Sequence, residues 1–272
     1  MSNIRYGCQF YTWQMSGEKY VGNMSHILDV VSRSSFAGIE PDVAIMGSYF
    51  DSTSQMKELL DKEGLELGAL CLVQDWRGPK ENEEERRTSE KLLDYIKDFP
   101  GTHLMLCQMP GDDRSDLEER QQNCLACVND IAKRAADIGV VSSHHPNSPG
   151  GSVFRTEEDY KIMIDGMDES VVGYCPDSGH ILNGDMDVYA IFEQYMPLIK
   201  HVHLKDRNAA GEWAAMGEGV TDFPRLMKML QDADYDGWVM IEEESSNAET
   251  DPDGATLING KYLVETLLPL GP

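Results

Sequence analysis

Short apolar segments alternate with longer amphipathic ones along the whole chain, eight of each. The strand-like segments lie at 4–10, 36–41, 65–73, 102–109, 139–145, 171–176, 199–205 and 237–243. The helix-like segments lie around 20–33, 52–63, 82–98, 116–138, 157–166, 187–196, 222–232 and 255–268, and "TEED" at 156–159 has the form of a capping box. Such alternation predicts a parallel sheet with its helices outside. Eight units predict an α/β fold that closes into a (β/α)8 TIM barrel, a single domain over residues 1–272. An open doubly wound sheet is disfavoured, because no glycine-rich turn follows the first segment.

The charge balance limits the classes of partner. Asp and Glu number 48 against 23 Lys and Arg, a formal net charge of −25. Nucleic acid and anionic membranes bind largely through cationic side chains, so neither is expected as a partner. The apolar runs are too short to cross a membrane, and the first ten residues lack the features of a signal peptide. We therefore expect a soluble, cytoplasmic protein.

The six cysteines point to packing rather than to redox or zinc chemistry. Four of them lie inside or at the ends of strand-like segments, where a thiol acts as a small hydrophobe. The motif "CLAC" (124–127) lies within the helical segment 116–138, and the chain has no second CxxC motif.

Polar groups end four consecutive strand-like segments. The segments run into "SSHHPNSPGG", "CPDSGH", "HVHLKDR" and "MIEEESS". Active sites of (β/α)8 barrels form at the carboxyl ends of the strands, so His145, Asp177, His203 and Glu242 should converge on one rim. Two imidazoles and two carboxylates predict a site for a divalent cation. Mixed ligands of this kind favour manganese, with magnesium, cobalt and zinc as alternatives.

The period of two along a strand sorts the neighbouring polar residues. His201, His203 and Lys205 share one face, which should look into the barrel, and His201 should lie deeper than His203. His144 should point the opposite way from His145. We interpret Glu243 and Glu244 as a solvated acidic run.

The carboxyl-terminal half resembles the xylose-isomerase-like barrel superfamily of sugar isomerases, epimerases and keto-sugar dehydratases. The resemblance rests on "VVGYCPDSGH", on "HVHLKD" and on the closing segment "GEGVTDFPRLMKMLQDADYDGWVMIEE", and covers about residues 138–245. It implies that Asp177, His203 and Glu242 are metal ligands and that His180 lies beside the substrate.

One motif departs from the epimerases of this group. They usually carry a glutamate at the end of the fifth strand, where this chain has "HHPN", which is closer to the corresponding turn of inosose dehydratases. His145 is the natural substitute ligand, and Asn147 and His144 stay open as alternatives.

Such a site supports proton transfer next to a carbonyl. A divalent cation can stabilise the enediolate that forms when a keto sugar loses a proton beside its carbonyl. Return of the proton gives epimerisation or isomerisation, and departure of a β-hydroxyl gives dehydration. The candidate catalytic groups are His180, Lys205 and Glu40, with His145 a further candidate base if it is not a ligand. We expect an isomerase or epimerase of a keto sugar or related polyol, with a keto-cyclitol (inosose-type) dehydratase, a lyase, as the alternative.

Three further residues are candidates for substrate binding by position alone. Trp13 could form an apolar wall, Gln108 could bind a hydroxyl, and Arg207 could hold an anionic or hydroxyl-rich end of the substrate. The charged loop 76–85 is a candidate lid or oligomer contact, so a homo-oligomer stays open. A non-catalytic sugar-binding barrel is a remote alternative, and a nuclease relative of this barrel would need a basic groove.

Overall fold

The computed structural model describes residues 3–271 as two compact units. One unit comprises residues up to Ala69 together with those from Val202 onward, and the other runs from Leu70 to His201. The single-domain organisation stays a prediction. Among the described residues, no helix is both long and apolar enough to span a membrane.

The first unit contains a five-stranded sheet with the order β3-β2-β1-β11-β8. Its strands are β1 (Asn3–Gln9), β2 (Gly38–Glu40), β3 (Glu66–Leu67), β8 (Val202–Leu204) and β11 (Asp236–Ile241), and all of its strand pairs are parallel. The first strand pairs with the last over six residues. Pairing of the first strand with the last is expected of a closed barrel and not of an open doubly wound sheet.

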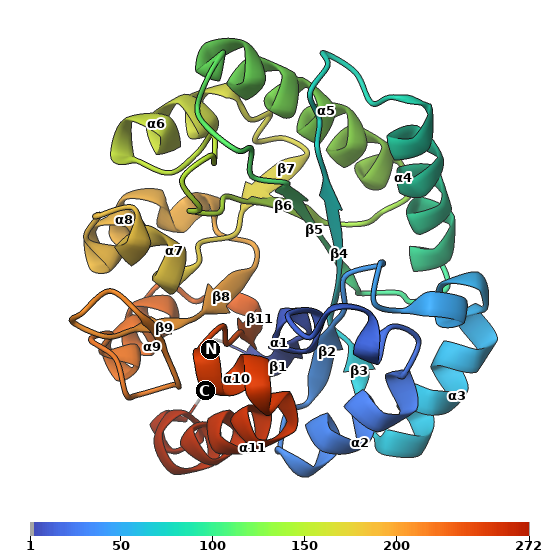
Figure 1. Ribbon diagram of the computed structural model, residues 1–272, viewed down its shortest axis with the longest axis vertical. Coiled ribbons are helices and arrows are strands. Elements are labelled where there is room, and N and C mark those ends of the chain that lie inside the picture. Colours follow the sequence, from blue (N-terminus) through green and yellow to red (C-terminus); the bar gives the residue numbers. More distant parts are fainter. Residues whose placement is uncertain (1–2, 272) are drawn as a thin grey trace. The chain divides into compact units, whose positions relative to one another are not determined.

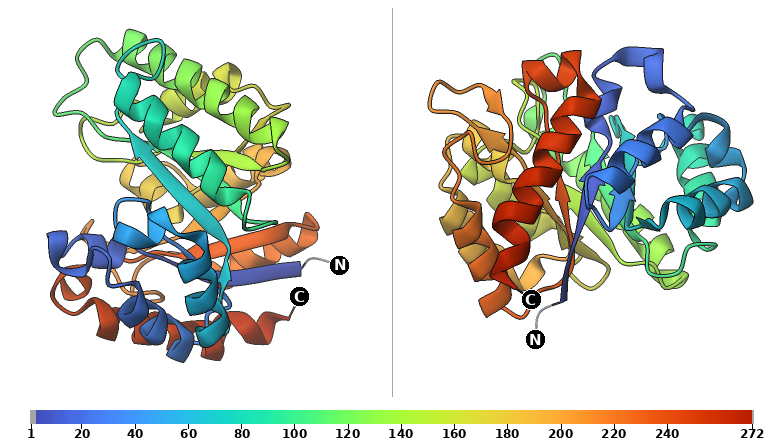
Figure 2. Two further views of the ribbon diagram at one scale, coloured as in Figure 1. Left: turned by 90° about the vertical axis from the view of Figure 1, so that its right-hand side faces the viewer. Right: turned by 90° about the horizontal axis from the view of Figure 1, so that it is seen from below.

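Helices and turns of this unit connect and flank the sheet. They are α1 (Tyr11–Gln14), α2 (Met24–Arg33), α3 (Thr53–Glu63), α9 (Phe223–Asp232), α10 (Ser246–Thr250) and α11 (Pro252–Tyr262), with short 3-10 turns at Gly17–Tyr20 and Gly47–Asp51. Strands β9 (Asp206–Arg207) and β10 (Trp213–Ala214) form a small antiparallel hairpin. In Figure 2 the carboxyl-terminal helix α11 (red) lies beside α2 (blue).

Two large side chains of β11 pack on one face of this sheet, in space that glycines of the neighbouring strands leave open. Trp238 and Met240 pack with Ala69 and are almost fully buried. A Cβ atom on Gly38 would lie 2.5 Å from the Trp238 ring, and one on Gly7 would lie 2.3 Å from the Met240 sulfur. Glycine at these positions therefore lets bulky residues occupy the interior face.

The second unit contains a four-stranded sheet with the order β4-β5-β6-β7 (Figure 1). The strands are β4 (Ala69–Gln74, starting at the boundary), β5 (His103–Gln108), β6 (Ser142–His145) and β7 (Val172–Tyr174); the helices are α4 (Glu83–Ile96), α5 (Leu117–Asp137), α6 (Glu157–Gly166), α7 (Ser178–Asn183) and α8 (Val188–Tyr195), followed by a 3-10 turn at Met196–Leu198. The pairs β5–β6 and β6–β7 are parallel. Cys71, Met105, Cys107 and Cys175 pack together among these strands, as expected for structural thiols.

All eight strand-like segments contain strands, and all eight helix-like segments contain helices. "TEED" forms the predicted capping box: Thr156 accepts from the Asp159 amide, and Asp159 accepts from the Thr156 amide. The segment 65–73 is split at Gly68 into β3 and β4. The predicted helix 255–268 starts earlier, with Pro252 in its first turn, and passes through a π-helical turn (Leu263–Leu267) into a 3-10 turn (Leu268–Leu270).

Candidate functional site

The first unit gathers charged side chains at the carboxyl ends of β2, β8 and β11. Nε2 of His203 lies 2.9 Å from Oε1 of Glu40, and its Nδ1 lies 2.9 Å from Oε2 of Glu242. All three side chains are buried, and so are Val202 and Leu204 on the opposite face of β8. Both faces of this strand are therefore buried, and its polar face meets buried carboxylates.

The two carboxylates dominate the electrostatics of His203. Burial alone would lower the pKa of its imidazole, but Glu40 and Glu242 outweigh burial and raise that pKa to about 10. Buried negative charge that holds a proton in this way is also the kind of environment that binds a cation.

Lys205 is fully buried in the same unit. Its ammonium nitrogen lies 3.0 Å from Oε1 of Glu242, also contacts Glu244, and lies 5.0 Å from the ring centre of Trp213. Its charge is thus compensated by two carboxylates, as a buried ammonium requires.

The interpretation of Glu243 and Glu244 as a solvated run is wrong. Glu243 is 2% exposed, and its carboxylate accepts from the hydroxyl of Ser245 and from the amide of Asn259 on α11. Glu244 turns back to Lys205, and burial raises the pKa of its carboxyl above the usual range. The signal was present in the sequence, since the period of two that places Glu242 also places Glu244 on the same side.

In the second unit, His145 and Asp177 face one another. Asp177 is fully buried and caps α7: its Oδ1 accepts from the amide of His180 at 2.8 Å. Its Oδ2 lies 3.6 Å from Nε2 of His145. That separation is long for a hydrogen bond. It is close to the spacing of about 3–3.5 Å between two ligand atoms that share one cation at bond lengths of about 2.1 Å.

The alternatives to His145 have other partners. Nδ1 of His144 lies 3.2 Å from the carbonyl oxygen of Leu106, on the opposite side of β6, and burial lowers the pKa of His144 to about 3. The side-chain amide of Asn147 donates to the carbonyl oxygen of Gln108 at 2.6 Å and accepts from Ser152. The predicted opposite orientation of His144 is confirmed.

Two more histidines lie at the amino-terminal side of their strands. The rings of His201 and His103 stack at 4.7 Å, nearly parallel, and Nε2 of His103 lies 2.6 Å from the Ser143 hydroxyl. His201 thus packs on His103, and its depth relative to His203 stays a prediction.

His180, on α7, is held by a residue that the sequence did not single out. Its Nδ1 lies 2.7 Å from the hydroxyl of Ser148, and its ring meets that of His145 edge-on at 5.4 Å. Ser148 lies in the loop after β6, within "HHPNSPGG", where several polar residues follow one another and no periodicity distinguishes them.

The three candidate substrate-binding residues are all engaged by protein groups. Trp13 is fully buried and donates its indole N–H to Asp253 at 2.9 Å. Gln108 turns to α5, where its amide oxygen accepts from the thiol of Cys124. Arg207, partly exposed on β9, donates its Nε–H to the carbonyl oxygen of Gly211 at 3.0 Å. Their roles toward a substrate stay predictions.

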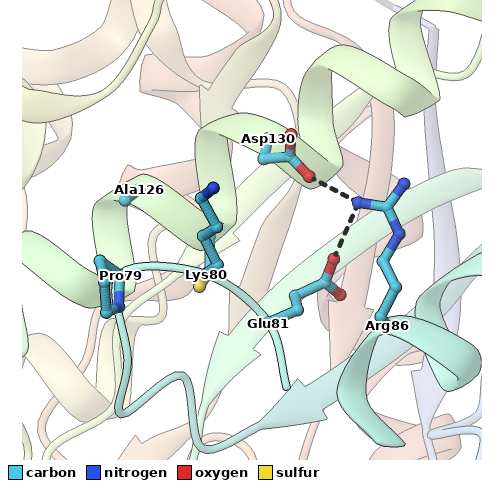
Figure 3. Close-up of a pocket in the computed structure, with 7 residues that line it drawn as sticks. Pro79, Lys80, Glu81, Arg86, Ala126 and Asp130 are labelled. Carbon is cyan, nitrogen blue, oxygen red and sulfur yellow. Dashed lines mark hydrogen bonds and ion pairs between the residues drawn. The ribbon is translucent and has the colours of Figure 1, made fainter. Parts of the chain in front are cut away.

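A pocket lies between the loop after β4 and helices α4 and α5, and most of the side chains that line it are charged (Figure 3). Lys80, Glu81, Arg86, Cys127 and Asp130 are among its lining residues. The Arg86 guanidinium lies 3.2 Å from Asp130 and 3.8 Å from Glu81, so these charges pair with one another. None of the predicted site residues lines this pocket.

Comparison with known proteins supports the fold and finds proteins of similar sequence and structure. A family model described as xylose isomerase-like TIM barrel matches residues 28–260. An inosose dehydratase of Clostridium botulinum (strain Alaska E43 / Type E3) is 31% identical over 238 residues, which cover 75% of this chain and 79% of the relative. Among solved structures, D-psicose 3-epimerase of Clostridium cellulolyticum H10 has a TM-score of 0.75 at 14% identity, covering 98% of this chain and 100% of that one. The IOLI protein with a bound zinc atom has a TM-score of 0.74 at 13% identity, covering 98% and 99%. The predicted (β/α)8 barrel is confirmed.

Proposed function

Because the chain belongs to the xylose isomerase-like TIM barrel family, we propose that it is a metal-dependent enzyme that removes a proton next to the carbonyl of a keto-cyclitol or keto sugar. We propose dehydration of a keto-cyclitol as the overall reaction. From the sequence we expect an isomerase or epimerase first and this dehydratase second, and the proposal reverses that order. The support is the 31% identity to an inosose dehydratase over three quarters of the chain, together with the "HHPN" turn after β6.

The metal ligands that we propose are Asp177, His203 and Glu242, with His145 as the fourth. The carboxyl ends of all strands of a (β/α)8 barrel lie on one rim. The observation that carries the proposal is that each unit, taken by itself, already pairs an imidazole with a carboxylate at such strand ends. When bound, a divalent cation would supply Lewis-acid stabilisation of the negative charge that develops on the carbonyl oxygen of the substrate. We propose manganese, with zinc, cobalt and magnesium as alternatives.

Glu40 has a contact that suits an orienting role. Its carboxylate lies 2.9 Å from Nε2 of His203, while Nδ1 of that ring faces Glu242. Histidine ligands usually donate their second ring N–H to a carboxylate, which fixes the ring and raises its basicity. We therefore propose that Glu40 orients His203, in place of the role as a catalytic group that the sequence suggests.

We propose that His180 and Lys205 act at the substrate oxygens, His180 as a hydrogen-bond donor and Lys205 as the candidate for proton transfer. Lys205, set between Glu242 and Glu244, would direct an ammonium group at an oxygen of the substrate. His180 lies in the first turn of α7, the helix that Asp177 caps, and would lie beside the substrate.

An isomerase or epimerase acting on a keto sugar is the second candidate. It would use the same first proton transfer and differ in where the proton returns. The fold shared with D-psicose 3-epimerase is compatible with it, although 14% identity supports the fold alone.

The test is to incubate the manganese-loaded protein with 2-keto-inositol and a panel of keto sugars in deuterated water. Dehydration would produce a conjugated enone or diketone with new ultraviolet absorption. Isomerisation or epimerisation would incorporate deuterium beside the carbonyl without that absorption. If no substrate reacts, the enzyme proposal fails and the sugar-binding alternative takes its place.

Two variants test the ligand set. We expect Asp177→Asn and Glu242→Gln to lose stoichiometric manganese, measured by elemental analysis, and about 100-fold or more in turnover, because each removes a ligand charge. Glu193→Gln, at an exposed position of α8, is the matched control and should keep both. Unchanged metal content and turnover in Asp177→Asn or Glu242→Gln, with the fold checked by circular dichroism, would refute the assignment.

A further inference from the structure

Ser148 is a buried hydroxyl with two side-chain neighbours. It is 1% exposed, and its Oγ lies 2.7 Å from Nδ1 of His180 and 2.9 Å from Nδ2 of Asn183. All three residues belong to the second unit, in the loop after β6 and in helix α7.

A second contact of Asn183 shows that its side chain donates the hydrogen bond to the Ser148 hydroxyl. Nδ2 of Asn183 also lies 3.3 Å from the backbone carbonyl oxygen of Ser148, which can only accept. The amide nitrogen, and not the amide oxygen, must therefore face Ser148, so Asn183 donates to the Ser148 hydroxyl oxygen.

The hydrogen of the Ser148 hydroxyl then has one acceptor among these neighbours, Nδ1 of His180. Within residues 3–271, the hydroxyl contacts Asn183, which donates, and Nδ1 of His180. If Nδ1 carried a hydrogen, the Ser148 oxygen would accept two bonds and its own buried hydrogen would have no acceptor, which is unfavourable. The favourable arrangement has Ser148 donating to a bare Nδ1.

Arg155 keeps this arrangement in place. Its Nε donates to the backbone carbonyl oxygen of Ser148 at 2.9 Å, and its Nη2 donates to that of Asn183 at 3.2 Å. One guanidinium thus joins the loop that carries Ser148 to the helix that carries His180, so the hydroxyl cannot easily turn away.

We propose that Ser148 is a positioning residue that fixes His180 as the tautomer with its hydrogen on Nε2. His180 then presents an N–H group, and not a lone pair, on the side of the ring away from Ser148. In the reaction, and here the inference rests on the proposed function, His180 donates a hydrogen bond to a substrate oxygen. The lone pair that accepts the carbon-bound proton must belong to another group.

The experiment reads the tautomer directly, by nitrogen–proton correlation spectra of the full chain labelled with 15N-histidine and loaded with diamagnetic zinc. The signals of His180 are assigned by their loss in His180→Gln. The variants are Ser148→Ala, which removes the hydroxyl, and Ser148→Thr, which keeps it. Ser152→Ala, a buried hydroxyl of the same loop that contacts Asn147 instead, is the matched control.

We expect a protonated Nε2 and a bare Nδ1 in the wild type, in Ser148→Thr and in the control, and a mixed or reversed pattern in Ser148→Ala. With any substrate that the enzyme converts, Ser148→Ala should lower kcat by about 10- to 100-fold, and Ser148→Thr should restore most of it. A hydrogen on Nδ1 in the wild type, or a Ser148→Ala spectrum identical to that of the wild type, would overturn the inference. The spectrum needs no turnover, so this failure is distinguishable from failure of the proposed function.

Discussion

Replacing Asp206 by asparagine should destabilise the loop that follows β8. Asp206 is fully buried, and its carboxylate accepts four backbone N–H groups. Oδ1 accepts from Arg207 at 2.9 Å and Thr221 at 3.3 Å, and Oδ2 accepts from Gly217 at 3.0 Å and Gly219 at 2.9 Å. The Asp206 side chain therefore holds backbone groups from Arg207 to Thr221 together. The same loop places Trp213 over Lys205.

The magnitude follows from counting acceptors. Asparagine offers one oxygen, so whichever way its amide turns, its NH2 group faces two N–H donors of the loop. Two hydrogen bonds to a charged group are worth about 1.5–3 kcal/mol each. Gly217 is exposed and can regain a water, so the net loss should be about 3 kcal/mol. For a chain of this length, that corresponds to a Tm lower by roughly 5 °C.

Calorimetry measures this loss, and limited proteolysis within 208–221 should become faster in Asp206→Asn. Asp168→Asn is the matched control, because Oδ1 of Asp168 accepts from the amide and the hydroxyl of Ser170 in an exposed turn, and asparagine keeps that oxygen. The control should change stability by less than about 0.5 kcal/mol. A Tm of Asp206→Asn within about 2 °C of the wild type would refute the reasoning.

Two further predictions concern the second unit and the thiols. Asp159→Asn should cost about 3 kcal/mol, because Asp159 accepts from both the Arg114 guanidinium and its own capping box. Burial opposes ionisation, yet these hydrogen bonds hold the pKa of Asp159 below its usual 3.8. Its stabilising contribution is thus complete above about pH 4 and lost at lower pH, so urea unfolding of wild type and variant should converge on acidification. All six cysteines are buried, and burial raises the pKa of Cys127 to about 12. We expect a thiol-disulfide reagent at pH 8 to react rapidly with them only in denaturant, and rapid reaction in the native state would contradict the packing.

The strands and the residues at their ends could be predicted because a strand repeats every two residues. His203 and Lys205 were placed on the face opposite Val202 and Leu204 by that rule, and the buried carboxylates beside them confirm it. The rule needs only the local sequence, so it holds even where, as here, both faces of the strand are buried. Helix α5 was predicted for a similar reason, since the 3.6-residue period extends through "CLAC".

The loop residues could not be predicted because their roles depend on contacts far apart in the chain. Ser148 meets Asn183 across 35 positions, and Asp206 meets Thr221 across 15. Neither contact leaves a period in the sequence. The position of Gln108 at the end of β5 suggested a hydroxyl ligand, but the period of two places it on the α5 side with Leu106. Position at a strand end is therefore informative only together with the face.

The acidic run after β11 shows how local alternation and the register between strands combine. Glu242 and Glu244 lie on one side, where both contact Lys205, while Glu243 between them bonds Asn259 on α11. Composition alone treats three adjacent glutamates as one solvated patch, because charged runs are usually exposed. Alternation separates Glu243 from its two neighbours, but it does not show that Lys205, which directly follows β8, lies beside Glu242 and Glu244. That information comes from the register of β8 against β11, which pairs Val202 with Val239 and so brings Lys205 alongside Glu242.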